Sequence, residues 1–214
     1  MRRIVVLLAL SLVAPASAQT LECAALKAGP QPFELTLDSS DKAVGKDPNA
    51  LQIRRQVHRK ADETTVTDIF PSDKTLRRTY YANGLLKEFL GFGETAPHVA
   101  SYSIDTGVDY FGLGKPFEFH NVMKTADGKA DADTTTSVTF DADVAVDLGG
   151  CSFKLTRIVE ATHGVVNDKP VATRVELWYS RELKTSLYSR LETQQGYILE
   201  LRASAIATTF TPVQ

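Results

Sequence analysis

The sequence predicts a mainly β protein whose antiparallel strands form an open, strongly curved sheet or half-barrel behind a short N-terminal segment. Three observations predict it. Apolar and polar residues alternate over many short stretches, turn-forming residues separate these stretches, and no connection has the length and pattern of a crossover helix. A β-sandwich is the alternative, although Trp178 follows both cysteines and the immunoglobulin order Cys…Trp…Cys is absent. A closed up-and-down barrel is a third arrangement.

The strand-like stretches follow one another along the chain with short connections. They are Phe33–Leu37, Leu51–Val57, Thr65–Ile69, Leu76–Tyr81, Leu85–Phe92, His98–Ile104, Phe117–Met123, Val138–Asp147, Cys151–Val159, Ala172–Ser180, Ser186–Thr193 and Tyr197–Ala207. The polar residues 126–136 indicate an exposed loop, and residues 163–170 indicate a further connection. Phe117–Met123 carries apolar residues on both faces, which predicts a strand that is covered on both sides.

Two short segments carry their own structural signals. Asn83-Gly84 predicts a hairpin with a type I′ turn, because that turn needs positive φ at both central residues. Leu183, Leu187 and Leu191 are spaced by four, which is typical of a helix. The same segment also alternates with period two and lies between two strand-like stretches, so a strand is favoured over the helix.

Residues 1–18 have the features of a secretory signal peptide. Arg2 and Arg3 precede an apolar run, and Ala16-Ser17-Ala18 predicts cleavage before Gln19. The run is too short to span a bilayer, which takes about 20 residues. We therefore expect a single β-rich domain, residues 19–214, exported to the periplasm or the cell exterior, with no integral membrane segment in the mature chain.

The charge balance argues against nucleic acid as a partner. Without the signal, 22 of the 24 lysines and arginines remain against 26 acidic residues, so the mature chain lacks a basic footprint. Basic residues do cluster at Arg54-Arg55, at His58-Arg59-Lys60 and at Arg77-Arg78. Acidic residues follow each cluster closely, which favours a solvated strand face over a site for an anion.

The two cysteines, Cys23 and Cys151, lie in the exported part of the chain. An even number of cysteines in an oxidising compartment indicates pairing. We expect a Cys23–Cys151 disulfide that fastens the N-terminal segment, residues 21–29, to the middle of the domain. Two unpaired thiols or an intermolecular bridge are the alternatives.

Recognisable catalytic and metal-binding motifs are absent from the sequence. The four histidines stand far apart and outside metal-ligand spacing, and no nucleophile motif occurs. Asp127, Asp131 and Asp133 resemble a calcium loop but lack its terminal glutamate. The sequence thus identifies no catalytic residue, no metal ligand and no cofactor, and it leaves ligand-binding residues unknown. Trp178, on a face that otherwise carries charge, is expected to cover a local apolar patch rather than to stack on a ligand.

The C-terminal region carries a resemblance. A strand that ends in Trp178-Tyr179-Ser180 is followed by Arg181-Glu182-Leu183, a strand, a short glycine turn and a final strand. Over about 40 residues, this arrangement resembles the C-terminal part of uncharacterised exported bacterial proteins with an open curved β-sheet. That sheet is similar to the folds of lipoprotein-carrier and lipoprotein-binding envelope proteins.

The resemblance implies a non-enzymatic periplasmic envelope protein that binds a lipid, a lipoprotein or a hydrophobic segment on its curved sheet. The absence of catalytic motifs and the expected two-sided apolar strand agree with this interpretation. The alternative is an envelope interaction module that holds a protein partner through a sheet edge or an aromatic patch.

Overall fold

The computed structural model describes residues 22–213, so the expected signal peptide lies outside the described residues. This part of the chain contains twelve strands and two short helices, α1 (Cys23–Ala28) and α2 (Tyr110–Leu113). The strands are β1 (Phe33–Lys42), β2 (Asn49–Arg59), β3 (Glu63–Ile69), β4 (Thr75–Tyr81), β5 (Leu86–Leu90), β6 (His98–Tyr102), β7 (Phe117–Lys124), β8 (Ala130–Leu148), β9 (Cys151–Val166), β10 (Lys169–Ser180), β11 (Thr185–Thr193) and β12 (Ile198–Ala207). Within residues 22–213, no helix is long and apolar enough to cross a bilayer.

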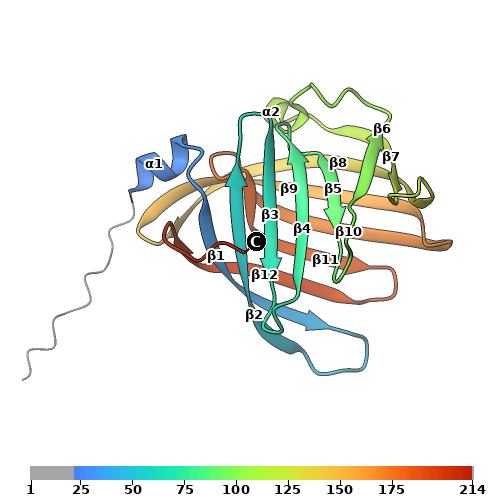
Figure 1. The fold of residues 1–214 in the computed structure, drawn as a ribbon, viewed down its shortest axis with the longest axis horizontal. Helices are drawn as coiled ribbons and strands as arrows, with labels where there is room; N and C mark the ends of the chain where they lie inside the picture. The colour runs from blue at the N-terminus through green and yellow to red at the C-terminus, as the bar shows by residue number, and fades with distance from the viewer. Residues whose placement is uncertain (1–21, 214) are drawn as a thin grey trace, which may run out of the picture.

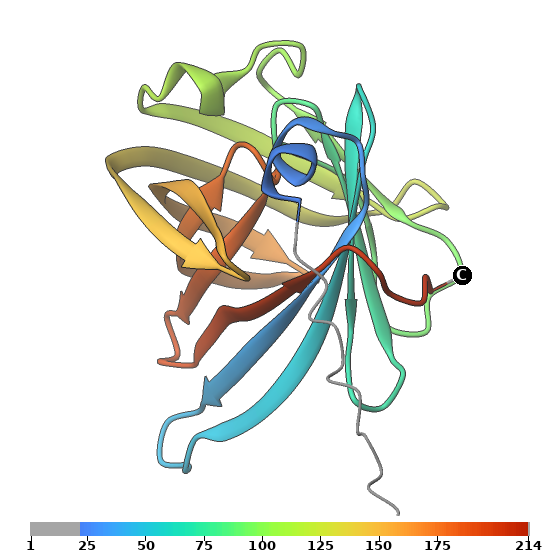
Figure 2. The ribbon, with the colours of Figure 1, turned by 90° about the vertical axis from the view of Figure 1, so that its left-hand side faces the viewer.

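The sheet closes into a twelve-stranded barrel (Figure 1). Each strand pairs antiparallel with its sequence neighbours, and β1 also pairs with β12, from Glu34 opposite Ala207 to Lys42 opposite Ile198. Figure 2 shows β1 in blue beside β12 in dark red. The predicted open sheet or half-barrel is therefore wrong, as is the β-sandwich, and the third arrangement is correct. Closure pairs the backbone groups that two long edge strands would otherwise expose.

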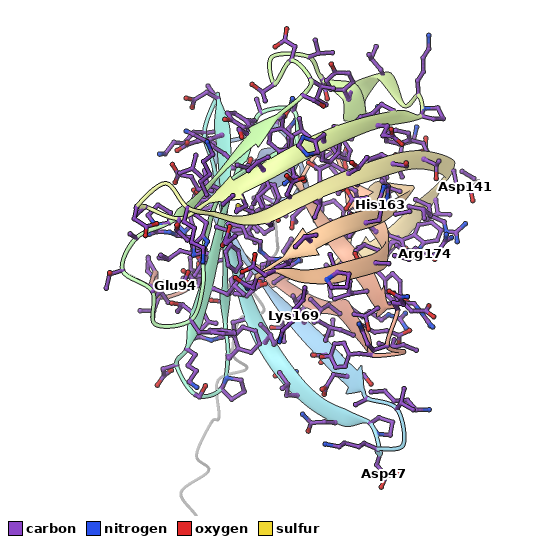
Figure 3. All side chains as sticks on the ribbon, turned by 90° about the vertical axis from the view of Figure 1, so that its right-hand side faces the viewer. Asp47, Glu94, Asp141, His163, Lys169 and Arg174 are labelled. Atoms are coloured by element: carbon purple, nitrogen blue, oxygen red, sulfur yellow. A yellow bond between two sulfur atoms is a disulfide. The ribbon has the colours of Figure 1, made fainter. Side chains whose placement is uncertain are left out.

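The two ends of the barrel differ. Because strands alternate in direction, the turns after β2, β4, β8 and β10 lie at the end where β1 begins, together with α1 and α2. We call this the helix end. Figure 3 faces the opposite end, with labelled Asp47 in the β1–β2 loop, Glu94 in the β5–β6 loop and Lys169 at the start of β10.

The Asn83-Gly84 hairpin forms between β4 and β5, but the predicted type I′ turn is wrong. Gly84 has a φ of 91°, whereas Asn83 keeps a negative φ. The Gly84 N–H donates to the Tyr81 carbonyl, and the Tyr81 N–H donates to the Leu85 carbonyl. This is a type I turn followed by a bulge at glycine. Asn83 contributes through its side chain instead, because its Nδ2 donates to the Val108 carbonyl and holds the β6–β7 connection over the turn.

Two predicted connections are strand rather than loop. β8 begins at Ala130, inside the expected loop 126–136, and β9 and β10 continue to a two-residue turn at Asn167-Asp168. Polar residues hid these strands, because threonines face the barrel interior and bond to one another. The Thr136 and Thr162 hydroxyl oxygens lie 2.8 Å apart across β8 and β9. The segment Leu183–Leu191 is largely strand β11, as favoured.

The end of β8 and the start of β9 extend past the barrel wall as an arm, residues 141–155. A bulge after Phe140 marks its start, and beyond it β8 and β9 pair only with each other among the described residues. One face of the arm buries Phe153 and Leu155 in the main core with Leu26 of α1 and Phe33 of β1. The arm and α1 together cover apolar side chains at the helix end.

The Cys23–Cys151 disulfide is confirmed. The two Cα atoms lie 5.5 Å apart, within the range that a disulfide requires. Cys23 begins α1, and Cys151 stands directly after the Gly149-Gly150 turn at the tip of the arm (Figure 1). The bond therefore joins two structures that project from the barrel at its helix end.

Removing the disulfide should lower stability strongly. The bond closes a loop across 128 positions, for which the chain-entropy model gives about 4–5 kcal/mol. We expect Cys23→Ser and Cys151→Ser each to lose roughly 3–5 kcal/mol of unfolding free energy in urea denaturation. Reductant should lower the wild type by the same amount and leave both variants unchanged. A loss below about 1 kcal/mol would contradict this role.

Candidate functional site in the barrel interior

The barrel encloses a cavity of about 320 Å³. At the helix end it is lined by Gly84 of the β4–β5 turn and Phe111 of α2. It extends toward the other end of the barrel, where Leu191 lies near the end of β11 and Leu199 near the start of β12. Pockets for small ligands begin at about 300 Å³, so this cavity is large enough to hold one.

The walls of the cavity differ in character. On the side of β10, β11 and β12, the lining contains five aliphatic residues, with Tyr179 and serine and threonine hydroxyls between them; the five are Val175, Leu177, Leu191, Leu199 and Leu201. On the side of β2 and β4, the lining contains Arg55, Arg78 and Tyr80. The cavity is therefore amphipathic.

Strand periodicity places the charges inside. Arg55 lies two residues from both Ile53 and Val57, which are 3% and 0% exposed, so all three side chains point into the barrel. Across the ladder, Arg55 stands opposite Asp68 of β3, and Arg78 of β4 stands opposite Val66. The three charged groups thus meet on neighbouring strands.

Arg55 and Asp68 form a buried ion pair with two hydrogen bonds. Arg55 Nε and Nη2 donate to the two carboxylate oxygens at 2.6 and 3.0 Å, and each side chain is 5% exposed. Arg78 Nη2 donates to the same carboxylate. Burial opposes ionisation of Asp68, but the two guanidiniums outweigh it and hold the pKa of its carboxyl below the usual value.

The cluster carries excess positive charge. Two guanidiniums share one carboxylate, which leaves a net charge of +1 from Arg55, Arg78 and Asp68. Arg78 is the less satisfied arginine, because its buried Nε has no hydrogen-bond partner among the described residues. Its side chain remains 26% accessible, and it lines the cavity.

Glu160 of β9 is a second ionisable group of the cavity. Its side chain shares a strand face with Ile158, which is 1% exposed. Burial raises the pKa of the Glu160 carboxyl to about 7. Near neutral pH this carboxyl therefore exchanges between a neutral hydrogen-bond donor and an anion.

The interpretation of the basic clusters as a solvated strand face is partly wrong. Arg54 and Arg77 are exposed as expected, whereas Arg55 and Arg78 line the interior. Arg59, 8% exposed, also points inward and donates to the carbonyls of Leu26, Gln31 and Glu182. Alternation with Ile53 and Val57 was the signal in the sequence that could have identified Arg55.

The histidines do not gather into one site. His98 contacts Asp131 through Nδ1 and lies 3.0 Å from Glu94 through Nε2. Burial lowers the pKa of the imidazole, but the two carboxylates outweigh it and raise the pKa above the usual value. Figure 3 shows labelled Glu94 and His163 on opposite sides of the barrel. Residues 22–213 contain no group of three or more His, Cys, Asp or Glu placed to hold a metal ion.

Trp178 lies on the outer face, where it packs against the main core. It lines a second hollow, of about 470 Å³, between the arm and the outside of β10–β12. Val144 and Val146 of the arm, 36% and 37% exposed, form its rim. The expectation that Trp178 covers an apolar patch agrees with this packing.

The prediction that strand Phe117–Met123 is covered on both faces is wrong. Phe117 and Phe119 face inward, whereas Glu118 and His120 on the other face are exposed. Val122 was the one apolar residue of that outer face, and it lies partly buried near the opposite end of the barrel from α2. This strand therefore gives no support to the expected apolar binding surface on the sheet.

Comparison with known proteins yields structural neighbours only. No protein-family model and no curated protein matches the chain. The hypothetical lipoprotein YmcC of Escherichia coli is 10% identical with a TM-score of 0.44, and the match covers 91% of this chain and 92% of YmcC. A protein of Bacteroides fragilis described as exported with a YmcC-like fold is 12% identical (TM-score 0.40; 82% and 95% covered). A protein of Parabacteroides distasonis described as a lipoprotein is 8% identical (TM-score 0.44; 83% and 97% covered).

The matches extend over most of the chain rather than over the C-terminal region alone. Identities of 8–12% and TM-scores of 0.40–0.44 assign no function to this chain. The open sheet implied by the resemblance does not apply, because β1 and β12 pair.

Glu160 should make stability depend on pH. Its pKa is raised from 4.5 to about 7 in the folded protein, so the folded state binds the proton more tightly than the unfolded state. The unfolding free energy should therefore fall as pH rises from about 4.5 to about 7, by up to about 3 kcal/mol from this group. Glu160→Gln should remove that loss and be more stable than wild type at pH 8.

Urea denaturation of both proteins between pH 4 and pH 8 measures the effect. The exposed Glu118→Gln, on the outer face of β7, is the matched control and should follow the wild-type profile. Parallel wild-type and Glu160→Gln profiles would contradict the raised pKa.

Proposed function

We propose that the protein is a non-enzymatic exported protein of the cell envelope that binds a small amphipathic molecule, such as a lipid with a short acyl chain, inside its barrel. The observation that carries the proposal is the amphipathic cavity, with leucines of β10–β12 on one side and the arginine cluster on the other. The ligand would lie in the interior rather than on an open sheet, because the sheet is closed.

The composition of the cavity supports binding rather than catalysis. Small-molecule pockets are typically apolar with a few polar groups that set orientation, and here the aliphatic wall would contact an acyl chain. The aliphatic residues Leu177 and Leu201 line the cavity together with Arg78. In this proposal the aliphatic wall supplies affinity and the charged wall sets the direction in which the ligand enters.

Export is part of the proposal. The Cys23–Cys151 disulfide supports it, because disulfides persist in oxidising compartments such as the periplasm. The signal-like residues 1–18 support it as well.

The alternative function, protein docking at a sheet edge, has less support. Closure removes the edges of the barrel body. The arm, residues 141–155, keeps edges that no other strand of residues 22–213 pairs. The hollow beside Trp178 is the aromatic patch on which a partner would lie.

Binding of medium-chain amphiphiles tests the proposal. We expect decanoic acid or decanol to bind with one-to-one stoichiometry and a dissociation constant in the micromolar range, measured by isothermal titration calorimetry at pH 6. Ser189→Trp, which fills the cavity from β11, should weaken this binding at least about tenfold.

Ser101→Trp is the matched control, because Ser101 is an exposed serine on the outer face of β6. It should bind as the wild type does. Absence of binding by both amphiphiles, or equal binding by the Ser189→Trp variant, would contradict a ligand site in the barrel.

A further inference from the structure

We propose that the cavity selects amphiphiles with an anionic head group of one negative charge, a carboxylate, and that Arg78 is the residue that binds it. This inference rests on the proposed function and specifies its ligand class. It concerns the charged wall of the cavity. The aliphatic wall accepts the acyl chain of the ligand, as in the proposed function.

The charge balance of the cavity calls for one anion. Arg55, Arg78 and Asp68 together carry +1. Lys184 also lines the cavity at its helix end, where it donates to the Ala82 carbonyl at 3.4 Å in an exposed hydrogen bond, so the buried excess charge is that of the arginine cluster. An uncompensated positive charge inside a barrel is costly, because the interior solvates it poorly. A bound carboxylate would offset that cost.

The hydrogen bonding of the two arginines distinguishes their roles. Arg55 uses Nε and Nη2 on Asp68, and its Nη1 lies 3.5 Å from the Ser186 hydroxyl. Arg55 is therefore committed to the protein. Arg78 uses Nη2 on Asp68 and also hydrogen-bonds with the Tyr80 hydroxyl, and its buried Nε has no hydrogen-bond partner among the described residues. Its side chain keeps accessible surface, so it is the arginine of this pair that a ligand can reach, and guanidinium suits carboxylate geometry.

The arrangement also explains why a carboxylate rather than a cation fits. Glu160 is the acidic residue of the lining, and burial favours its neutral form. Below about pH 7 it therefore does not cancel the positive charge of the arginine cluster. A cationic head group would meet net repulsion on this wall.

Arg78→Met separates head-group recognition from folding. Methionine keeps an unbranched apolar stem, and the variant leaves Arg55 and Asp68 as a neutral pair with both hydrogen bonds intact. The net charge of the cluster falls from +1 to zero, so the fold should tolerate the change. Arg78→Lys keeps the charge and is the second variant. Arg77→Met, at the exposed neighbouring arginine, is the control.

The experiment compares four probes at pH 6 by calorimetry: decanoate, decanol, decyltrimethylammonium and acetate. Wild type and Arg77→Met should bind decanoate at least about tenfold more tightly than decanol, and acetate and the cation should bind far more weakly. Arg78→Met should bind decanoate and decanol about equally, with decanol affinity unchanged. Arg78→Lys should keep part of the preference.

Each outcome decides between the claims. Equal binding of decanoate and decanol by the wild type would overturn the head-group inference while the proposed function stands. An undiminished preference in Arg78→Met would overturn the role of Arg78. If acetate binds as tightly as decanoate, the claim that the ligand is an amphiphile is overturned, and a small free anion is favoured instead. Failure of both decanoate and decanol to bind would overturn the proposed function itself.

Discussion

The pairing of β1 with β12 is the constraint on which the rest of the structure depends. It turns a twelve-stranded meander into a closed barrel and divides every strand into an inner and an outer face. Inward positions on β2, β3 and β4 are then enclosed, so that the ion pairs among Arg55, Asp68 and Arg78 lie in the interior. An open sheet would expose the same residues to water, where their ion pairs would contribute little.

The helix end is packed, whereas the interior is hollow. At the helix end, α1 and the arm bury Leu26, Phe153 and Leu155 over the barrel and are joined by the Cys23–Cys151 disulfide. The interior beyond them keeps a cavity instead of filling with side chains. Buried charges with incomplete partners cost stability, and such a cost is expected where a site is reserved for a ligand.

Most of the strands could be predicted from the sequence because their period-two pattern is local. The start of β8 at Ala130 could not, because threonines occupy its inward positions in place of apolar residues. The disulfide followed from the cysteine count, and the Asn83-Gly84 hairpin from its turn residues. Closure could not be read, because it depends on pairing between the first and last strands, which leaves no local signal. The candidate site likewise leaves no local signal in the sequence. The sequence indicates only that Arg55 faces the same side of its strand as Ile53 and Val57. Its contact with Asp68 depends on the register of β2 and β3.

The central claim is that a ligand lies inside the barrel, and nuclear Overhauser effects between a bound amphiphile and methyl-labelled protein test it most directly. With decanoate bound, we expect effects from its alkyl protons to the methyl groups of Leu177, Leu199 and Leu201, which line the cavity. Effects confined to Val144, Val146 and Leu187, which line the outer hollow beside Trp178, would contradict it.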